Sequence, residues 1–247
     1  MKAEPREQLR LLDLQELDLR LDRLRHRGNN LPEAARAAKL ATDAAQAHDR
    51  EVELRTRVSD LQREIRKLDT EVQKVRERAA SDEKLMQSGS ITSAKQLQDL
   101  EHEIASLARR QAELEDGELE LMEQMEQLQA EHHSAEIDRD RLAAESSAAL
   151  GDRDRALQEV MADGRAATTE RRQVAAEISD ELRSLYDRIR KEHGGVGAVV
   201  FSNGQCGGCR LTMVPSDVSA LRGAALDDVL RCDECRRILI RAAMLAQ

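Results

Sequence analysis

The sequence predicts a mainly α-helical protein with a small β-rich domain at its carboxyl end. Leucine, isoleucine and valine recur at alternating steps of three and four along most of the chain, which is the spacing of a coiled coil. After a glycine-rich break at residues 194–197, short strand-like runs surround four cysteines. Charged residues make up 35% of the 247 residues and aromatic residues only 1%, which excludes one globular core for the whole chain.

The first helix is expected at about residues 6–28, where leucines recur among charged residues. Residues 28–32, Gly-Asn-Asn-Leu-Pro, carry a glycine, a capping asparagine and a proline in the order that ends one helix and begins another. A second helix is therefore expected at about residues 32–87. The seam of the first helix steps by three and four through Leu14, Leu17, Leu21 and Leu24.

Two long heptad seams lie on either side of residues 88–92, a glycine-containing and serine-rich stretch that favours a turn. The second helix keeps its heptad spacing from Leu54 to Ala79, and a third helix, at about residues 93–192, recovers that spacing from Leu97. A short turn leaves two such helices as antiparallel neighbours. The sequence therefore predicts a long antiparallel coiled-coil hairpin over residues 1–193.

All four cysteines of the chain stand in two C-x-x-C pairs: Cys206, Cys209, Cys232 and Cys235. Four thiolates are the ligands that tetrahedral Zn²⁺ prefers, and two paired turns bring four thiolates together. Two disulfides are one alternative, but a C-x-x-C bridge is strained, and a thioredoxin-like redox motif would need a βαβ pattern that the sequence lacks. We expect residues 196–247 to form a C4 zinc ribbon that binds one structural Zn²⁺ per chain.

Short strands are expected on both sides of each cysteine pair, at residues 198–201, 210–214, 228–231 and 237–241, with a short helix at residues 216–221. Asn203-Gly204 is a tight-turn signal before the first pair. The ribbon has few apolar residues, so much of its folding free energy is expected to come from the metal. Removing the metal is expected to unfold the ribbon and to leave the coiled coil intact.

Acidic residues outnumber basic ones by 48 to 39, so the net charge of −9 gives no general attraction for nucleic acid. Binding to phosphates would therefore depend on a local patch. Tyr186 and Phe201 are the only aromatic residues, which leaves few side chains that could stack on bases. The candidate basic patch around the ribbon consists of Arg188, Arg190, Lys191, Arg210, Arg222, Arg231, Arg236, Arg237 and Arg241.

The amino terminus lacks the apolar region of a secretory signal, and no apolar stretch approaches the ~20 residues that cross a membrane. We therefore expect a cytoplasmic protein that has no membrane partner. The six histidines are scattered, without a nucleophile and a third group at matched positions, so we expect no enzyme activity. They are His26, His48, His102, His132, His133 and His193.

Three motifs give the chain a resemblance to a known bacterial family. The first is Ser-Ala-Lys-Gln-Leu at residues 93–97 with Leu-Glu-His-Glu-Ile at 100–104, and the second is Leu-Glu-Asp-Gly-Glu-Leu-Glu-Leu-Met-Glu at 114–123. The third is the pair Cys-Gly-Gly-Cys and Cys-Asp-Glu-Cys. In these the chain resembles cytoplasmic proteins with a long coiled-coil hairpin followed by a C4-type zinc ribbon, although Arg236 stands where the family commonly has glycine.

The resemblance implies a non-enzymatic regulator, since family members are described as nucleic-acid-binding proteins and some are associated with an alternative sigma factor or with transcripts. The residues themselves favour a zinc-binding adaptor, in which a coiled-coil rod presents the ribbon to a protein partner such as a transcription component. An acidic coiled coil suits a basic protein partner. Binding of RNA or DNA through the basic patch is the alternative, and self-association of the coiled coil is a further possibility.

Overall fold

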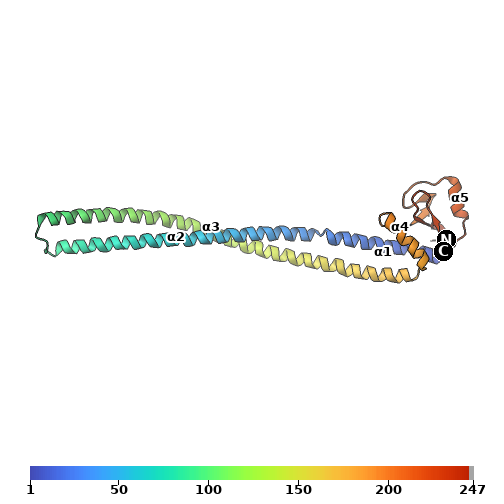
Figure 1. The fold of residues 1–247 in the computed structure, drawn as a ribbon, viewed down its shortest axis with the longest axis horizontal. Coiled ribbons are helices and arrows are strands. Elements are labelled where there is room, and N and C mark those ends of the chain that lie inside the picture. The colour runs from blue at the N-terminus through green and yellow to red at the C-terminus, as the bar shows by residue number, and fades with distance from the viewer. Residues whose placement is uncertain (245–247) are drawn as a thin grey trace. The chain divides into compact units, whose positions relative to one another are not determined.

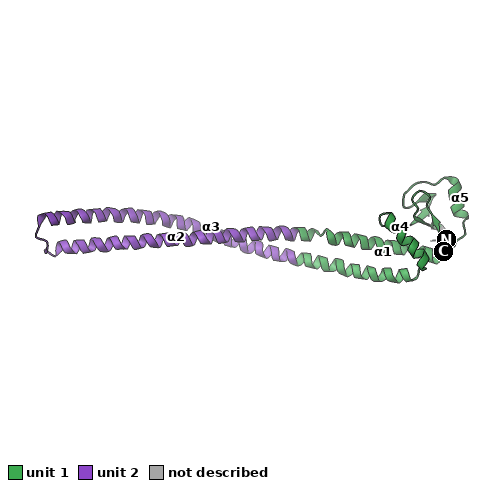
Figure 2. Ribbon diagram, viewed as in Figure 1, with its two compact units in different colours: residues 1–35, 151–247 green, residues 36–150 purple. Residues whose placement is uncertain are grey.

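The computed structural model describes residues 1–244, and it confirms a mainly helical chain with a small sheet near its carboxyl end (Figure 1). The contacts divide the chain into two compact units, coloured separately in Figure 2. Unit 1 contains residues 1–35 and the described residues from 151 onward, and unit 2 contains residues 36–150. The elements are α1 (Pro5–Asn29), α2 (Pro32–Gln87), α3 (Ala94–Ala176), α4 (Asp180–Glu192), β1 (Ala198–Ser202), β2 (Gln205–Cys206), α5 (Pro215–Gly223), β3 (Leu230–Arg231), β4 (Ile238–Arg241) and a 3₁₀ turn (Ala242–Met244).

Unit 2 is the antiparallel helical hairpin that the heptads predicted, formed by α2 from residue 36 and by α3 up to residue 150 (Figure 2). Apolar side chains from the two helices meet in its seam, where Leu54 packs with Leu128. At the tip, Gly89 has a φ of 67°, a left-handed conformation that glycine adopts without strain. The predicted turn is thus made by the residue that suits it.

The helix expected to run without interruption over residues 93–192 is in fact two helices, because α3 ends at Ala176 and α4 begins at Asp180. Ser179 between them has an extended backbone, with φ −58° and ψ 145°. Its hydroxyl donates a hydrogen bond to a carboxylate oxygen of Glu7 on α1 at 2.7 Å. A contact between distant parts of the chain therefore stabilises the break, which no glycine or proline marks in the sequence.

The break allows the apolar face of α4 to turn into the core of unit 1. Ile178, Leu182, Tyr186 and Ile189 are all almost completely buried there. Burying a large apolar side chain is worth about 1.5–3 kcal/mol, whereas a backbone hydrogen bond contributes about 1 kcal/mol net. Burial of this face therefore outweighs the few hydrogen bonds that an unbroken helix would keep.

The sheet has the strand order β2-β1-β4-β3, and β1 runs parallel to β4 while the two outer pairs are antiparallel. The strand expected at residues 210–214 is absent from the described sheet. Only an isolated bridge joins Thr212 to Gln205. Asn203 and Gly204 have φ angles of 51° and 73°, as the predicted tight turn between β1 and β2 requires.

The sheet shares one hydrophobic core with the helices of unit 1. Ile238 and Ile240 of β4 pack in the same cluster as Leu11 and Leu14 of α1 and Tyr186 of α4. The amino-terminal residues also bond the ribbon through the backbone. The N–H of Ala3 donates to the carbonyl of Asp227 at 2.9 Å, and the N–H of Val229 donates to the carbonyl of Met1 at 3.2 Å. The sheet is therefore part of the same compact unit as α1 and α4, and the domain boundary expected at residues 193–196 stays a prediction.

Candidate zinc centre and the polar junction beside it

The four cysteines converge in unit 1 from β2, from the loop after it, and from the turn between β3 and β4. Their sulfur atoms all lie within 4.8 Å of one another. The Cys206 and Cys235 Sγ atoms are 3.7 Å apart, and the Cys209 and Cys232 Sγ atoms are 3.8 Å apart. A tetrahedron with Zn–S bonds of about 2.3 Å has edges of about 3.8 Å, so the cluster has the size of a ZnS₄ site.

The two cysteine turns have the same backbone geometry. The N–H of Arg210 donates to the carbonyl of Cys206, and the N–H of Arg236 donates to the carbonyl of Cys232, each at 2.8 Å. Both arginines have positive φ angles, 60° and 58°. This left-handed conformation favours glycine, which gives a physical reason for the glycine that the resembling family commonly has where this chain has Arg236.

Close packing accounts for the two glycines of the first turn. A Cβ atom on Gly207 would lie 2.7 Å from the carbonyl oxygen of Val200, and one on Gly208 would lie 2.6 Å from Cδ of Arg237. The Gly208 N–H also points at the Cys206 sulfur, at 3.4 Å. Small residues here therefore let the backbone approach both the sheet and the sulfur cluster.

The donor set fits one structural zinc ion. Burial raises the pKa of the Cys206 thiol and of the Cys232 thiol, so a cation is needed to keep all four sulfurs as thiolates. The four protein ligands fill the tetrahedral positions, which leaves no position for a water or a substrate on the metal. The centre can hold the ribbon together, and its donor set is not that of a catalytic zinc.

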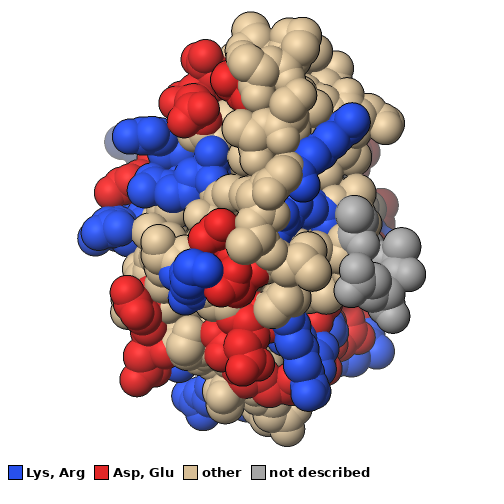
Figure 3. All heavy atoms as spheres, turned by 90° about the vertical axis from the view of Figure 1, so that its right-hand side faces the viewer, with Lys and Arg blue, Asp and Glu red and all other residues tan. Residues whose placement is uncertain are grey.

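The nine basic residues of the predicted patch fall into two groups. Five have exposed side chains, and for these a binding role stays a prediction: Arg188, Lys191, Arg210, Arg222 and Arg236. The other four hold the fold together: Arg190, Arg231, Arg237 and Arg241. On the face drawn in Figure 3, Lys and Arg alternate with Asp and Glu and do not gather into one basic surface.

Three of the engaged arginines donate to backbone carbonyls. Arg241 is buried and donates to the carbonyls of Ala224 and Ala225 at 2.7 and 2.8 Å. Arg237 donates to the carbonyls of His193 and Val196, each at 3.1 Å. Arg231 donates from Nε to the carbonyl of Arg236 at 2.9 Å. A phosphate could bind Arg241 or Arg237 only at the cost of these bonds.

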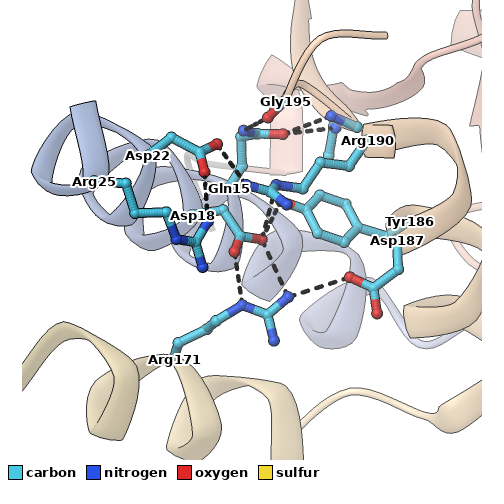
Figure 4. Close-up of polar contacts among 11 residues, drawn as sticks. Gln15, Asp18, Asp22, Arg25, Arg171, Tyr186, Asp187, Arg190 and Gly195 are labelled. Atoms are coloured by element: carbon cyan, nitrogen blue, oxygen red, sulfur yellow. Dashed lines mark hydrogen bonds and ion pairs between the residues drawn. The ribbon is translucent and has the colours of Figure 1, made fainter. Parts of the chain in front are cut away.

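A polar junction beside the ribbon is centred on Asp18, whose side chain is 4% exposed (Figure 4). Arg171 of α3 donates to both of its oxygens, at 2.6 and 3.2 Å, and the Tyr186 hydroxyl donates at 2.9 Å. Arg190 lies 3.4 Å from the same carboxylate and also bonds Asp22. One buried carboxylate thus joins α1, α3 and α4.

The same junction reaches the ribbon through Gln15. Its side-chain nitrogen donates to the carbonyl of Gly195 at 2.8 Å, and its oxygen accepts from the N–H of Gly197 at 2.6 Å (Figure 4). Gly197 has no room for a side chain, because a Cβ would lie 2.8 Å from the Tyr186 ring. Burial, and then the charge of Asp18, raise the pKa of Tyr186, so the phenol remains a hydrogen-bond donor.

This junction was not predicted from the sequence, and the predicted seam of the first helix is correct at Leu14 and Leu21, which are buried. The buried face of α1 runs through Leu11, Leu14, Asp18 and Leu21, whereas Leu17 is only partly buried. An aspartate at a seam position was the available signal. A charge there requires a buried partner, which is what Arg171 supplies.

A second group of metal-ligating side chains lies in unit 2. Glu51, whose side chain is 2% exposed, has His132 Nε2 at 3.2 Å, and His132 in turn has Glu136 at 3.9 Å. Arg139 and Arg55 lie 3.4 and 3.6 Å from the Glu51 carboxylate. Two guanidinium groups already balance this carboxylate, so the cluster is an ion-pair network within the hairpin.

A helical hairpin joined to a four-cysteine zinc ribbon defines the class of protein. The model of the CT398-like coiled coil hairpin domain matches residues 14–194, and that of the C4-type zinc ribbon domain matches residues 205–239. The chain therefore belongs to the CT398-like coiled-coil hairpin family. Among residues 1–244, no helix combines the length and apolar character that a membrane crossing needs.

Relatives agree with this assignment over nearly the whole chain. The uncharacterized protein Rv2229c of Mycobacterium tuberculosis is 38% identical over 98% of both chains. A solved structure from Mycobacterium smegmatis has a TM-score of 0.82 and 36% identity, covering 98% of this chain and 100% of its own. The structure of CT398 from Chlamydia trachomatis, with a TM-score of 0.65, 20% identity and coverages of 95% and 97%, shares the fold.

Proposed function

We propose that the protein is a non-enzymatic, zinc-binding adaptor whose ribbon docks on a protein partner. The observation that carries this proposal is a sparsely charged, exposed surface on the ribbon, named here the α5 surface and made of residues 211–226. The first partners to test are components of the transcription machinery, including sigma factors. Binding of RNA or DNA is the alternative that the experiment below separates.

The α5 surface differs from the rest of the chain in its small share of charged residues. Only Asp217 and Arg222 are charged among its 16 residues, whereas 35% of the whole chain is charged. Leu211, Val214 and Leu226 are each about half exposed, at 52%, 56% and 48%. Exposed apolar surface of this kind is typical of protein–protein contact sites.

Helix α5 has no fully buried residue: Val218 and Leu221 pack, partly buried, against the core of the sheet, and its other side is left exposed. At the height of α5 in Figure 1, the face drawn in Figure 3 is largely uncharged. A protein partner that covered Leu211 and Val214 would remove this apolar area from water. Such burial favours association without any chemistry at the metal.

Direct nucleic-acid reading has less support. The two aromatic residues, Tyr186 and Phe201, are buried in the cores of unit 1, so neither can stack on a base. Guanidinium groups of Arg237 and Arg241 are occupied by backbone carbonyls. The exposed Arg210, Arg222 and Arg236 could contact phosphates, and the two outside the α5 surface, Arg210 and Arg236, are changed in the variant that tests this alternative.

The test is affinity capture from native lysate, followed by binding of the identified partner in purified form. Leu211→Asp with Val214→Asp should abolish binding, because it places charge in the contact, and nuclease should leave the wild-type interaction unchanged. Arg210→Ser with Arg236→Ser, both exposed and both outside the α5 surface, is the matched control and should bind normally. Zinc content and helical circular dichroism verify that every variant folds.

A partner that is lost on nuclease treatment and in the arginine variant, but kept by the aspartate variant, would replace the adaptor proposal with nucleic-acid binding. Retained binding by both variants would place the contact outside the ribbon surface.

A further inference from the structure

A groove in unit 1 combines an apolar floor with a rim of arginines. It lies between α1 and the part of α3 beyond residue 151, and its volume is about 830 Å³. We name it the arginine-rimmed groove. Its lining residues include Leu21, Leu24, Leu157, Val160 and Met161 on the floor and sides, with Arg25, Arg165 and Arg172 around them.

The apolar part of this groove is open to solvent. Leu157 is 40% exposed and Met161 is 52% exposed. A Cβ placed on Gly164 would have nothing within 4 Å, so the groove is not filled at that point by a neighbouring side chain. Large apolar side chains exposed together at one place indicate a surface that another molecule covers.

The charge of the groove has one sign. No Asp or Glu is among the groove's lining residues in the described part of the chain. Arg165 and Arg172 have no carboxylate within 4.0 Å among residues 1–244, while Arg25 pairs with Asp22 at 2.8 Å. In a chain of net charge −9, this is a local site for an acidic, amphipathic helix.

A segment with the complementary properties lies in unit 2, at residues 113–126 of α3. It contains seven acidic residues and no basic one. Leu119 and Met122 are exposed by 59% and 47%, whereas Leu114 is buried in the hairpin. We name residues 113–126 the acidic segment.

Leu119 stands on the outer face of the hairpin with carboxylates around it. Asp116 precedes it by three residues, and Glu123 and Glu126 follow it by four and seven, which places all three on the same side of the helix. None of these three has a basic side chain within 4.0 Å among residues 1–244. Their charges are therefore available to a partner.

We propose that the arginine-rimmed groove of one copy of this chain binds the acidic segment of a second copy. Leu119 and Met122 would cover the floor at Leu157 and Met161, and the carboxylates would face Arg165 and Arg172. Helix α3 contributes to both surfaces in each copy.

The two surfaces also match in length. Residues 157–172 of the groove span about 22 Å of helix, and the 13 steps from residue 113 to residue 126 span about 20 Å. An RNA or DNA strand would meet the arginines but would leave the leucine and methionine side chains uncovered. A second copy satisfies both the apolar and the charged part of the groove. The inference is independent of the α5 surface and of the zinc centre.

Charge reversal on each side tests the contact. The groove variant is Arg165→Glu with Arg172→Glu, and the segment variant is Glu123→Arg with Glu126→Arg. Sedimentation velocity should detect self-association of the wild type that weakens with added salt. Each variant alone should associate about tenfold more weakly or worse, because like charges then face one another.

Mixing the two variants should restore association in a 1:1 complex, since reversed charges again meet opposite ones on both surfaces. Arg109→Glu, an exposed reversal on α3 outside both surfaces, should leave association unchanged. Helical circular dichroism and zinc content verify that all variants fold. A monomeric wild type, or folded variants that do not associate when mixed, would overturn the proposal. Unchanged association in both variants would place the dimer contact elsewhere and would also overturn it.

Discussion

The two compact units bury their apolar residues in different ways. Unit 1 surrounds Leu14, Leu182 and Ile238 completely, because three helices and a sheet close around them. In unit 2, two helices leave most seam positions of α2 partly exposed, such as Val58, Leu61 and Leu68, although Leu54 and Val72 are buried. Stability in unit 1 is therefore concentrated in a few sites, whereas unit 2 adds many small contributions along a seam.

The polar contacts follow the same division. Asp18 in unit 1 is buried and receives hydrogen bonds from two side chains, Arg171 and Tyr186. The pair Arg76–Glu115 in unit 2 is one of many surface ion pairs, and both of its side chains are at least one-third exposed. Surface pairs of this kind are worth about 0–1 kcal/mol. Changes in unit 1 should therefore have larger effects than matched changes in unit 2.

Zinc removal is expected to give the largest difference between the units. Structural zinc in small ribbons supplies on the order of 10 kcal/mol of folding free energy. Chelation, or Cys232→Ser, should unfold the sheet and also loosen α1 and α4, because Ile238 and Ile240 share their core. Hydrogen exchange should show lost protection at residues 198–241 and in α1 and α4, with protection kept over residues 36–150.

The effect expected here is wider than the one expected from the sequence, which confined the unfolding to the ribbon and left every helix of the coiled coil intact. Unchanged protection in α1 and α4 after chelation would show that metal removal unfolds the ribbon alone. Loss of protection in unit 2 would show that the two units unfold as one.

Short-range patterns account for what the sequence predicted correctly. Heptad spacing over Leu54–Ala79 and the turn at Gly89 fix the hairpin, and two C-x-x-C pairs fix the zinc centre. Each of these patterns depends on residues that are close in the chain. The parallel pairing of β1 with β4 is not of this kind, because it joins strands separated by the whole metal-binding loop.

Contacts between distant residues account for what the sequence did not reveal. Ile178 fits the heptad spacing as well as the core that it enters, so nothing local marked the break between α3 and α4. Arg190 and Arg241 were likewise predicted to bind phosphate, because the sequence does not show which distant groups accept their hydrogen bonds.

Removing the Asp18 carboxylate is expected to have the next largest effect. Asp18→Ala leaves Arg171 and Tyr186 without their acceptor, which should destabilise unit 1 by on the order of 3 kcal/mol. Tyr186 is the only tyrosine and the chain has no tryptophan, so tyrosine fluorescence reports the unfolding of unit 1. Glu115→Ala is the matched control in unit 2 and should change stability by less than about 1 kcal/mol. Equal losses in both variants would remove the proposed difference between the units.

Glu51 should give the smallest effect, and one that depends on pH. Burial alone would raise the pKa of Glu51, but the hydrogen bond with His132 and the charges of Arg55 and Arg139 outweigh it and hold that pKa below its ordinary value. His132 also faces Glu136, whose carboxylate is more exposed. A carboxylate with a lowered pKa stabilises the folded chain above its unfolded pKa of about 4.3, and this contribution is lost as the pH falls through the folded pKa.

Glu51→Gln should therefore be less stable than the wild type at pH 7, and the difference in melting temperature should shrink as the pH is lowered below about 4. Thermal melting followed by helical circular dichroism measures the difference at each pH, which cancels the titration of the many other carboxylates. Glu101→Gln, an exposed position outside the acidic segment with no basic side chain within 4.0 Å among residues 1–244, should have the melting temperature of the wild type at every pH. If the difference in melting temperature between the wild type and Glu51→Gln stays constant or widens on acidification, the charge of Glu51 does not stabilise the hairpin. The variant's deficit would then come from packing alone.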